Sequence, residues 1–271
     1  MDPCGRVGPD RARARLTRVT PVNWLVFQPH ELDANGTLLL TDRRARHLCR
    51  AVRVKCGDVI HVAQLDGRRG RGEVLEVGHD RVRIRCQMDE LPFPAWPVVV
   101  WVAMPRPKVA RRLWMHLAAL GVEEIWVTGG DGVEASYLDS GALSSDEFSR
   151  CLLEGLEQSG GTHMPRVVIE RRWSREWLHA QLAQRAAYDR WVADTDGKGS
   201  SLCAPQHGLI LAVGPERGWS ERERHWLRDL GFRTLCLGPR VLRTDAACLM
   251  ALGLVSSIWP VPSAVASTSQ L

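Results

Sequence analysis

Two glycine-proline turns contain the residues of this sequence that are best suited to bind a ligand. One reads G-P-E-R-G-W-S over residues 214–220 and follows an apolar run; the other reads L-G-P-R-V-L-R-T-D over residues 237–245. Glycine lets the backbone approach a ligand closely, and proline keeps the turn rigid. Ligands of parallel α/β sheets bind outside the carboxyl ends of the strands, where such turns lie. Either turn alone is more typical of an ordinary strand-to-helix connection, but the pair predicts a binding pocket.

Several common cofactor and metal motifs are absent. The sequence has no G-x-G-x-x-G and no G-K-[ST], which excludes the Rossmann fingerprint and the P-loop. Its eight cysteines include no C-x-x-C pair, so we expect neither a zinc ribbon nor a redox pair, and we predict no metal site. Scattered cysteines in an enzyme-sized chain indicate buried thiols in a reducing compartment.

The charged residues favour a nucleic-acid partner. The formal net charge is +5, and arginine far outnumbers lysine. The planar guanidinium group of arginine suits phosphates and base edges. A GC-rich genome would produce the same bias through codon usage, so composition alone leaves both explanations open.

The elements that must position the two turns alternate between strands and helices from residue 98 onwards. We expect strands over 98–103, 125–128, 191–193, 209–213 and 234–237, and helices over 108–120, 144–158, 174–184, 221–230 and 246–255. Gly121 should end the first of these helices, Ser174 should cap another, and Ser220 with Glu223 forms a capping box. The alternation predicts an α/β fold with a mostly parallel sheet and helices on both faces. Trp101 and Trp126 lie in apolar strands and should be core residues.

A different pattern precedes this alternation. Short strands are expected over 24–27, 38–40, 59–62, 73–77 and 81–86, with one short helix over 43–52. In the last strand, apolar residues alternate with Arg81, Arg83 and Arg85, which puts the arginines on the outer face. The pattern predicts a small β-barrel with a basic exterior, followed by a stiff linker that ends at Pro97.

These patterns divide the chain into four parts. We expect a disordered extension over residues 1–21, a barrel domain over 22–91, an α/β domain over 98–259 and a flexible tail over 260–271. The longest apolar run, residues 98–104, is too short to span a bilayer, and no apolar stretch follows the arginine-rich N-terminus as a secretory signal would require. We therefore expect a cytoplasmic protein with no membrane partner.

In this order and at this spacing, the two turns resemble those of the SPOUT class of methyltransferases, whose C-terminal chain threads a trefoil knot. Within that class the sequence resembles the ribosomal RNA small-subunit methyltransferase E family, which methylates N3 of a uridine in 16S ribosomal RNA. The family's G-P-E-G-G-hydrophobe-S and L-G-x-R-hydrophobe-L-R-x-E-T/A-A turns correspond to residues 214–220 and 237–247. Its barrel motif, its E-L-G-V helix and its E-Q-S/C-G segment correspond to residues 47–53, 108–122 and 157–160.

The resemblance implies a knotted α/β domain after a PUA-like RNA-binding barrel, with S-adenosylmethionine as the cofactor. It also implies ribosomal RNA of the small subunit as the partner, and a homodimer. The cofactor would contact ten residues of the two turns: Val213, Gly214, Pro215, Glu216, Gly218, Leu237, Gly238, Val241, Leu242 and Thr244.

The resemblance also implies roles for charged residues. Arg243 would stabilise the anion that develops on uridine, and Glu216 or Asp245 would accept the N3 proton. A structural ion pair between Arg243 and either carboxylate is the alternative. RNA phosphates would contact six basic residues: Arg43, Arg46, Arg50, Arg53, Lys55 and Arg240. For the five in the barrel, a solvated helix face is the alternative.

Four positions depart from the family pattern. Arg217 stands where the family has glycine, Asp245 replaces a glutamate, Gly161 replaces an arginine, and the loop 129–131 lacks an expected arginine. The loss of basic groups near the substrate cleft, together with the gain of Arg217, indicates a divergent enzyme. Two further functions therefore stay open: a SPOUT ribose 2′-O-methyltransferase acting on another RNA, and a catalytically inactive RNA-binding ribosome-assembly factor.

Overall fold

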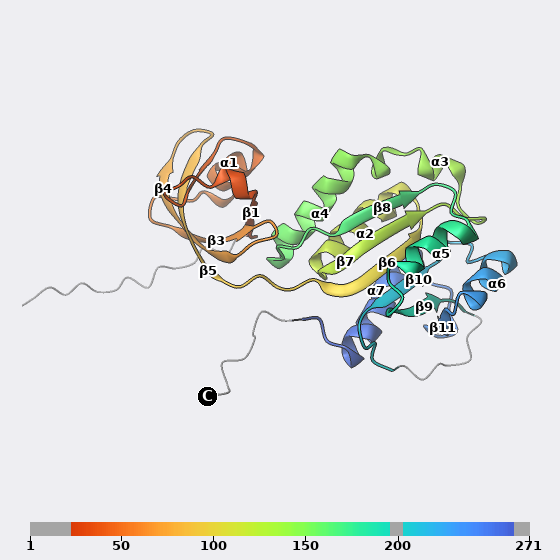
Figure 1. The fold of residues 1–271 in the computed structure, drawn as a ribbon. Coiled ribbons are helices and arrows are strands. Elements are labelled where there is room, and N and C mark those ends of the chain that lie inside the picture. Colours follow the sequence, from red (N-terminus) through yellow and green to blue (C-terminus); the bar gives the residue numbers. More distant parts are fainter. Residues whose placement is uncertain (1–22, 196–202, 263–271) are drawn as a thin grey trace, which may run out of the picture.

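The computed structural model describes residues 23–195 and 203–262, which form two β-sheets joined in one chain (Figure 1). The predicted extension over residues 1–21 and most of the predicted tail lie outside these ranges. The first sheet has the spatial order β1-β3-β4-β5-β2, which leaves β1 and β2 as edge strands, so it is an open half-barrel. Its strands are β1 (Leu25–Phe27), β2 (Thr37–Leu40), β3 (Val59–Gln64), β4 (Arg69–Val77) and β5 (Val82–Glu90).

The helix predicted in this small sheet is present as α1 (Arg43–His47), continued by a π-helical turn (Leu48–Val52). The predicted alternation in β5 is also confirmed, because Val82 and Ile84 are buried whereas Arg83 and Arg85 are exposed. The outward arginines are partly neutralised by the neighbouring strand. Arg81 pairs with Glu76, and Arg85 lies 3.5 Å from a carboxylate oxygen of Glu73.

The second sheet has six strands, all parallel, in the order β11-β9-β10-β6-β7-β8. This confirms the predicted α/β fold. The strands are β6 (Trp96–Ala103), β7 (Val122–Thr128), β8 (Arg166–Glu170), β9 (Asp189–Ala193), β10 (Leu209–Val213) and β11 (Arg233–Leu235). The helices are α2 (Pro107–Ala119), α3 (Ala135–Leu138), α4 (Ser145–Ser159), α5 (Arg175–Ala183), α6 (Glu221–Asp229) and α7 (Thr244–Ile258).

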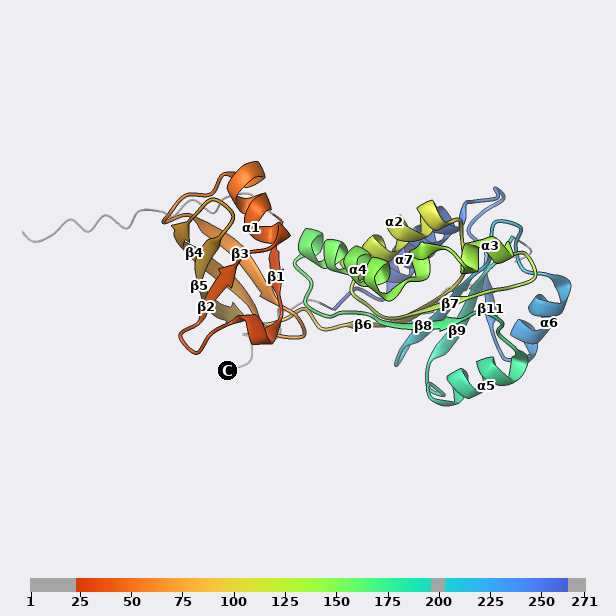
Figure 2. The same ribbon diagram turned by 90° about the horizontal axis from the view of Figure 1, so that it is seen from above.

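Helices cover both faces of this sheet, as Figure 2 shows, with α2, α4 and α7 on one side and α5 and α6 on the other. The central strand β6 serves both layers. Val100 packs among the first group of helices, and Trp101 packs into a cluster with Trp173 and Trp219 on the opposite face. Trp101 and Trp126 are fully buried, as predicted, and the Trp101 indole donates to Thr128 Oγ1 at 2.8 Å.

Two differences from the sequence analysis have local causes. The linker was expected to end at Pro97, but Pro97 lies inside β6, which pairs with β7 from Trp96 onwards. Proline cannot donate to a ladder, and the register shifts between Trp96 and Val99 to accommodate it. Strand β8 was not predicted, because it lies at the sheet edge and its burial does not alternate clearly.

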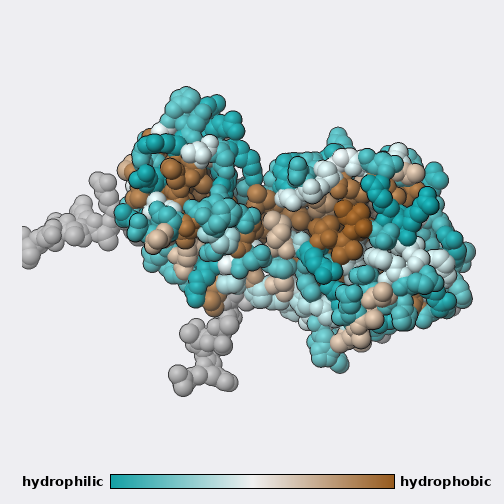
Figure 3. Space-filling view, turned by 45° about the horizontal axis from the view of Figure 1, so that its top comes forward, coloured by the Kyte–Doolittle hydropathy of each residue, from teal (hydrophilic) through white to brown (hydrophobic). Residues whose placement is uncertain are grey.

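Most of the face in Figure 3 is polar, with apolar areas near the middle of the larger part and on the smaller part. Seven large apolar side chains are exposed among the described residues: Leu39, Val77, Leu91, Ile169, Val241, Met250 and Val261. None of the helices in the described ranges combines the length and apolar character that a bilayer crossing requires.

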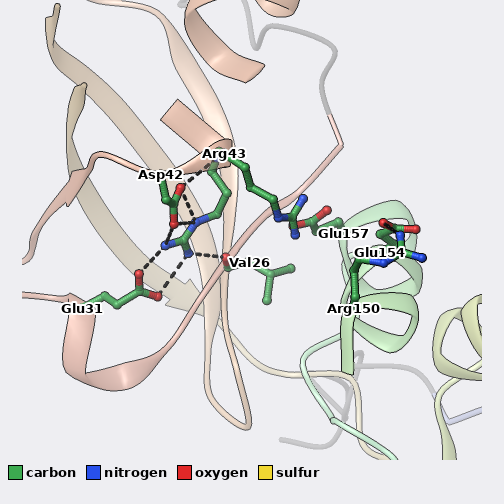
Figure 4. A network of polar contacts seen from close by, with 8 residues as sticks. Val26, Glu31, Asp42, Arg43, Arg150, Glu154 and Glu157 are labelled. Carbon is green, nitrogen blue, oxygen red and sulfur yellow. Dashed lines mark hydrogen bonds and ion pairs between the residues drawn. The ribbon is translucent and has the colours of Figure 1, made fainter. Parts of the chain in front are cut away.

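The two sheets are joined by a tight contact between the start of β1 and the end of α4. The Trp24 amide donates to the carbonyl of Glu157 at 2.8 Å, and Arg43 Nη2 lies 3.0 Å from Glu157 Oε1. Figure 4 shows Arg43 extended towards Glu157. Burial raises the pKa of the Glu157 carboxyl group, and the nearby Arg43 guanidinium partly opposes this shift. A side chain on Gly160 would meet the Trp24 ring at 2.4 Å, so the contact requires glycine there.

Candidate cofactor pocket

A cavity of about 170 Å³ lies at the carboxyl ends of β9, β10 and β11, where the two glycine-proline turns meet. The structure brings together every residue that the resemblance assigned to the cofactor. The ten that line the cavity are Val213, Gly214, Pro215, Glu216, Gly218, Leu237, Gly238, Val241, Leu242 and Thr244. Arg217 and Arg240 line it as well.

The first turn is shaped by contacts between its own residues. The Gly218 amide donates to the Pro215 carbonyl at 2.8 Å, and Gly218 has a φ of +74°, a conformation that favours glycine. A side chain on Gly214 would lie 3.1 Å from the Trp219 indole nitrogen. Glycine therefore allows the indole to pack against the backbone at the mouth of β10.

The loop after β7 supports this turn from outside the cavity. Glu223 is almost fully buried and accepts hydrogen bonds from the amides of Ser220 (2.8 Å) and Asp131 (3.0 Å). Ser220 in turn caps α6, which confirms the predicted capping box. A Cβ on Gly132 would lie 2.9 Å from Pro215 Cγ. The loop that lacks the family's arginine therefore braces the first turn through packing and hydrogen bonds.

The second turn closes the cavity from the other side. Gly238 has a φ of +108°, and no heavy atom lies within 4 Å of the place where its Cβ would project. The Thr244 hydroxyl donates to the Gly214 carbonyl at 3.2 Å, which joins the two turns at the start of α7. A side chain at Gly238 would thus enter the open space that both turns surround.

The carboxylates of the two turns are held by α2 and the residue before it. The Arg106 amide donates to Glu216 Oε1 at 3.3 Å, and Arg112 Nη2 lies 3.3 Å from Asp245 Oδ2. The alternative ion pair of Arg243 with either carboxylate is not formed. Arg243 is exposed, precedes the first turn of α7 and does not line the cavity.

Part of the cavity wall is formed by residues that the sequence did not predict. Asp194, whose side chain is 9% exposed, binds the Arg224 guanidinium group with Nε–Oδ2 and Nη2–Oδ1 distances of 2.8 and 3.3 Å. Asp194 directly follows a predicted strand, and its position was the signal that the sequence offered. Arg224 lies on a predicted helix but belongs to no motif. The other missed residues are Ala193, Thr195, Trp219 and Ala247.

Cys248 is the cysteine of α7 that follows the second turn. It is fully buried, and burial raises the pKa of its thiol to about 12. The thiol therefore stays protonated at neutral pH, whereas a nucleophilic cysteine acts as the thiolate. Within the described residues, no group of three or more His, Cys, Asp or Glu side chains is placed to hold a metal ion.

The five basic residues proposed for RNA in the small sheet do not line the cavity. Two of them are ion-paired, Arg43 with Glu157 and Arg50 with Asp80 at 2.7 Å. The other three are exposed, and their side chains form no ion pair within the described part of the chain: Arg46, Arg53 and Lys55.

Gly161, which was expected near the substrate cleft, does not line the first cavity. A Cβ at this position would meet Leu156 at 2.9 Å and Ser159 at 3.2 Å. Gly161 lines a second, separate cavity with Phe93 and His163, next to the contact between the two sheets. The absence of an arginine here changes packing at that contact and removes no charge from the first cavity.

Comparison with known proteins places this architecture in a family. Residues 92–256 match the model of the RNA methyltransferase domain. The chain belongs to this RNA methyltransferase family. The matched range contains the whole six-stranded sheet and both glycine-proline turns, so the cavity lies within the methyltransferase domain.

Individual methyltransferases resemble the chain over most of its length. The ribosomal RNA small-subunit methyltransferase E of Treponema pallidum is 28% identical over 243 residues, which covers 86% of this chain and 90% of that protein. The protein of the same name from Bacillus subtilis is 26% identical, covering 83% and 92%. A crystal structure of the Neisseria gonorrhoeae methyltransferase E bound to S-adenosyl methionine superposes with a TM-score of 0.69, at 21% identity, covering 87% and 98%. These comparisons confirm the predicted family resemblance.

Proposed function

We propose that this protein methylates N3 of a uridine in 16S ribosomal RNA, with S-adenosylmethionine as the methyl donor. The observation that carries the proposal is the convergence of two turns, which follow the separate strands β10 and β11, on one cavity at the strand ends. Relatives of similar length named as small-subunit methyltransferase E support the RNA substrate. The bound S-adenosyl methionine in the Neisseria structure supports the cofactor.

The residues of the cavity suit this cofactor. The space beside the Gly238 backbone is open, and a Cβ at this position would fill it. Leu237, Val241 and Leu242 offer apolar contacts for an adenine ring. Backbone groups of both turns face the same space, held together by the Thr244–Gly214 hydrogen bond. S-adenosylmethionine, when bound, supplies an electrophilic methyl group.

The protein's main contribution to such a reaction is to hold uridine N3 in line with that methyl group. The N3 proton must leave, and Glu216 at the cavity wall is the proposed acceptor. Arg243 is the proposed cation for the anion that develops on the base, since its exposed guanidinium forms no ion pair with the described residues. Asp245 is less suited as the base because, unlike Glu216, it does not line the cavity.

The finer architecture is part of the same proposal. We assign residues 22–91 to a PUA-like RNA-docking domain and residues 98–259 to a SPOUT domain whose C-terminal chain forms a trefoil knot. The return of Thr244 to Gly214 and the packing of α7 near β9 and β10 support the knot. Val241 and Met250, 80% and 45% exposed, support a homodimer through the second turn and α7. We expect the enzyme to act in the cytoplasm, where it meets ribosomal RNA.

Mass mapping of ribosomal RNA tests the proposed reaction. A strain that lacks the gene should lose one base-methylated uridine from 16S ribosomal RNA, and the wild-type gene should restore it. Loss of a ribose methyl group, or of a methyl group in another RNA, would instead favour a 2′-O-methyltransferase. An unchanged methylation map together with an assembly defect would favour an inactive assembly factor.

The effect of Arg217 on the cavity can be tested by substitution. This exposed arginine lines the cavity where the resembling family has glycine. If the side chain points to solvent, Arg217→Gly should leave cofactor affinity and turnover unchanged; if it narrows the cavity, the substitution should tighten binding. Calorimetry and single-turnover methylation measure the two effects. A loss of activity in Arg217→Gly would contradict both expectations and show that Arg217 contributes to function.

The small sheet should contribute to RNA affinity through its exposed cations. We expect Arg46→Gln, Arg50→Gln and Arg53→Gln together to weaken RNA binding and to lower the salt slope by roughly 0.7–0.9 for each phosphate that the variant no longer binds. Affinity for S-adenosylmethionine should not change, because none of the three lines the cavity. Titration of RNA over a salt series, beside cofactor calorimetry, measures both. An unchanged slope would mean that this face is only solvated surface.

A further inference from the structure

The N-terminal end of α2 lies against both glycine-proline turns. The Arg106 amide binds Glu216 of the first turn, and Arg112 binds Asp245 of the second. Lys108 lies one helical turn before Arg112 and therefore on the same side of the helix. This end of α2 is thus part of the surface around the cavity, although none of its residues lines the cavity itself.

The cations at this end of α2 are well exposed. The side chains of Arg106 and Arg112 are 69% and 57% exposed, and Lys108 is exposed as well. Each arginine makes one long contact to a carboxylate, at 3.9 and 3.3 Å, which leaves most of its N–H donors free for other acceptors. Exposed ion pairs of this kind stabilise the fold little. We name Arg106, Lys108 and Arg112 the α2 rim.

The α2 rim continues into further cations on the turns. Arg217 and Arg240 are exposed and line the cavity from opposite turns, and exposed Arg243 precedes α7. Six basic side chains therefore surround the cavity mouth, and the turns contribute two carboxylates, Glu216 and Asp245. A surface with such an excess of positive charge attracts a polyanion.

The small sheet offers less free charge than its sequence suggests. Arg43, Arg50, Arg81 and Arg85 are all ion-paired with acidic residues of this chain. Of these pairs, the one between Arg43 and Glu157 belongs to the contact that joins the two sheets. Exposed cations therefore lie on both parts of the chain, and those next to the cavity belong to the methyltransferase domain.

We propose that the α2 rim binds the phosphate backbone of the RNA substrate beside the nucleotide that enters the cavity. This inference rests on the proposed function, because it takes RNA to be the substrate. The rim lies next to the turns that hold Glu216 and Asp245, so phosphates bound there place the adjoining base over the cavity. Phosphate contacts of this kind set register and orientation without reading sequence.

The test compares two matched triple variants on a short, uridine-containing single-stranded RNA. The rim variant is Arg106→Gln/Lys108→Gln/Arg112→Gln. The control variant is Arg171→Gln/Arg172→Gln/Arg175→Gln, which removes the same charge from exposed positions of the same domain, two of them also ion-paired. The rim variant should lower the salt slope of RNA affinity by about 2, at roughly 0.7 per phosphate contact, and should weaken binding at least tenfold near 50 mM salt. The control should keep the wild-type slope.

Two results would overturn the proposed role of the α2 rim. One is an unchanged slope in the rim variant; the other is an equal fall in both variants, which would show an effect of total charge. Cofactor calorimetry on each variant verifies that the cavity is intact. The salt slope and methylation test different claims. A lowered slope in a protein that methylates no uridine would support the α2 rim and refute the proposed reaction. Methylation of the uridine together with an unchanged slope would support the reaction and refute the α2 rim.

Discussion

Gly238→Val is expected to abolish binding of S-adenosylmethionine. Gly238 lines the cavity, has a φ of +108° and has no heavy atom within 4 Å of its projected Cβ. A branched side chain there would occupy the space between the two turns, which the cofactor must enter. Calorimetry with the purified variant should detect no binding at cofactor concentrations that saturate the wild type.

The positive φ complicates this variant, because a β-branched residue in that conformation costs on the order of 1–3 kcal/mol. Gly121→Val is the matched control. Gly121 has a φ of +72° and equally open surroundings, but it lies outside the first cavity, after α2. It should show a similar decrease in thermal stability with normal cofactor affinity. Unchanged affinity in a folded Gly238→Val protein would remove this turn from the cofactor site.

Arg243→Ala should lower the rate of methyl transfer by about 10²- to 10³-fold, the usual effect of removing one group that stabilises a developing anion. Cofactor affinity should stay within about twofold, because Arg243 does not line the cavity. Single-turnover methylation of 16S ribosomal RNA, beside cofactor calorimetry, measures the two quantities separately.

Two further variants limit the interpretation of Arg243. Arg243→Lys keeps the charge and should recover part of the rate, which a purely steric role would not predict. Arg172→Ala removes another exposed arginine from the same domain and should leave the rate unchanged. A full rate in Arg243→Ala would exclude the electrostatic role, and an equal loss of RNA affinity and rate would make Arg243 a phosphate-binding residue instead.

The parts of the fold that depend on local patterns could be predicted from the sequence. Ser174 and Ser220 mark the starts of α5 and α6, because a capping hydroxyl binds an amide only three residues away. The apolar run 98–103 is buried on both faces, as a central parallel strand requires. The two glycine-proline turns indicated the cavity because each combines two local features: a glycine that lets a ligand approach the backbone, and a preceding apolar strand.

Contacts between distant segments could not be predicted in this way. Asp194 and Arg224 share a wall of the cavity, yet 30 positions separate them and no motif links them. Arg43 was expected to hold RNA, but its partner is Glu157, 114 positions later in the chain. A cation can be identified from the sequence but its spatial neighbour cannot, so the small sheet has fewer unpaired cations than predicted.

The contact between Trp24, Arg43 and α4 has a consequence for the choice of target. Main-chain hydrogen bonds and close packing against Gly160 leave this joint little freedom to bend. An RNA element held by the small sheet would therefore stand at a fixed reach from the cavity. The enzyme would then select a uridine by its distance from the RNA element bound to the small sheet, as well as by the bases around it.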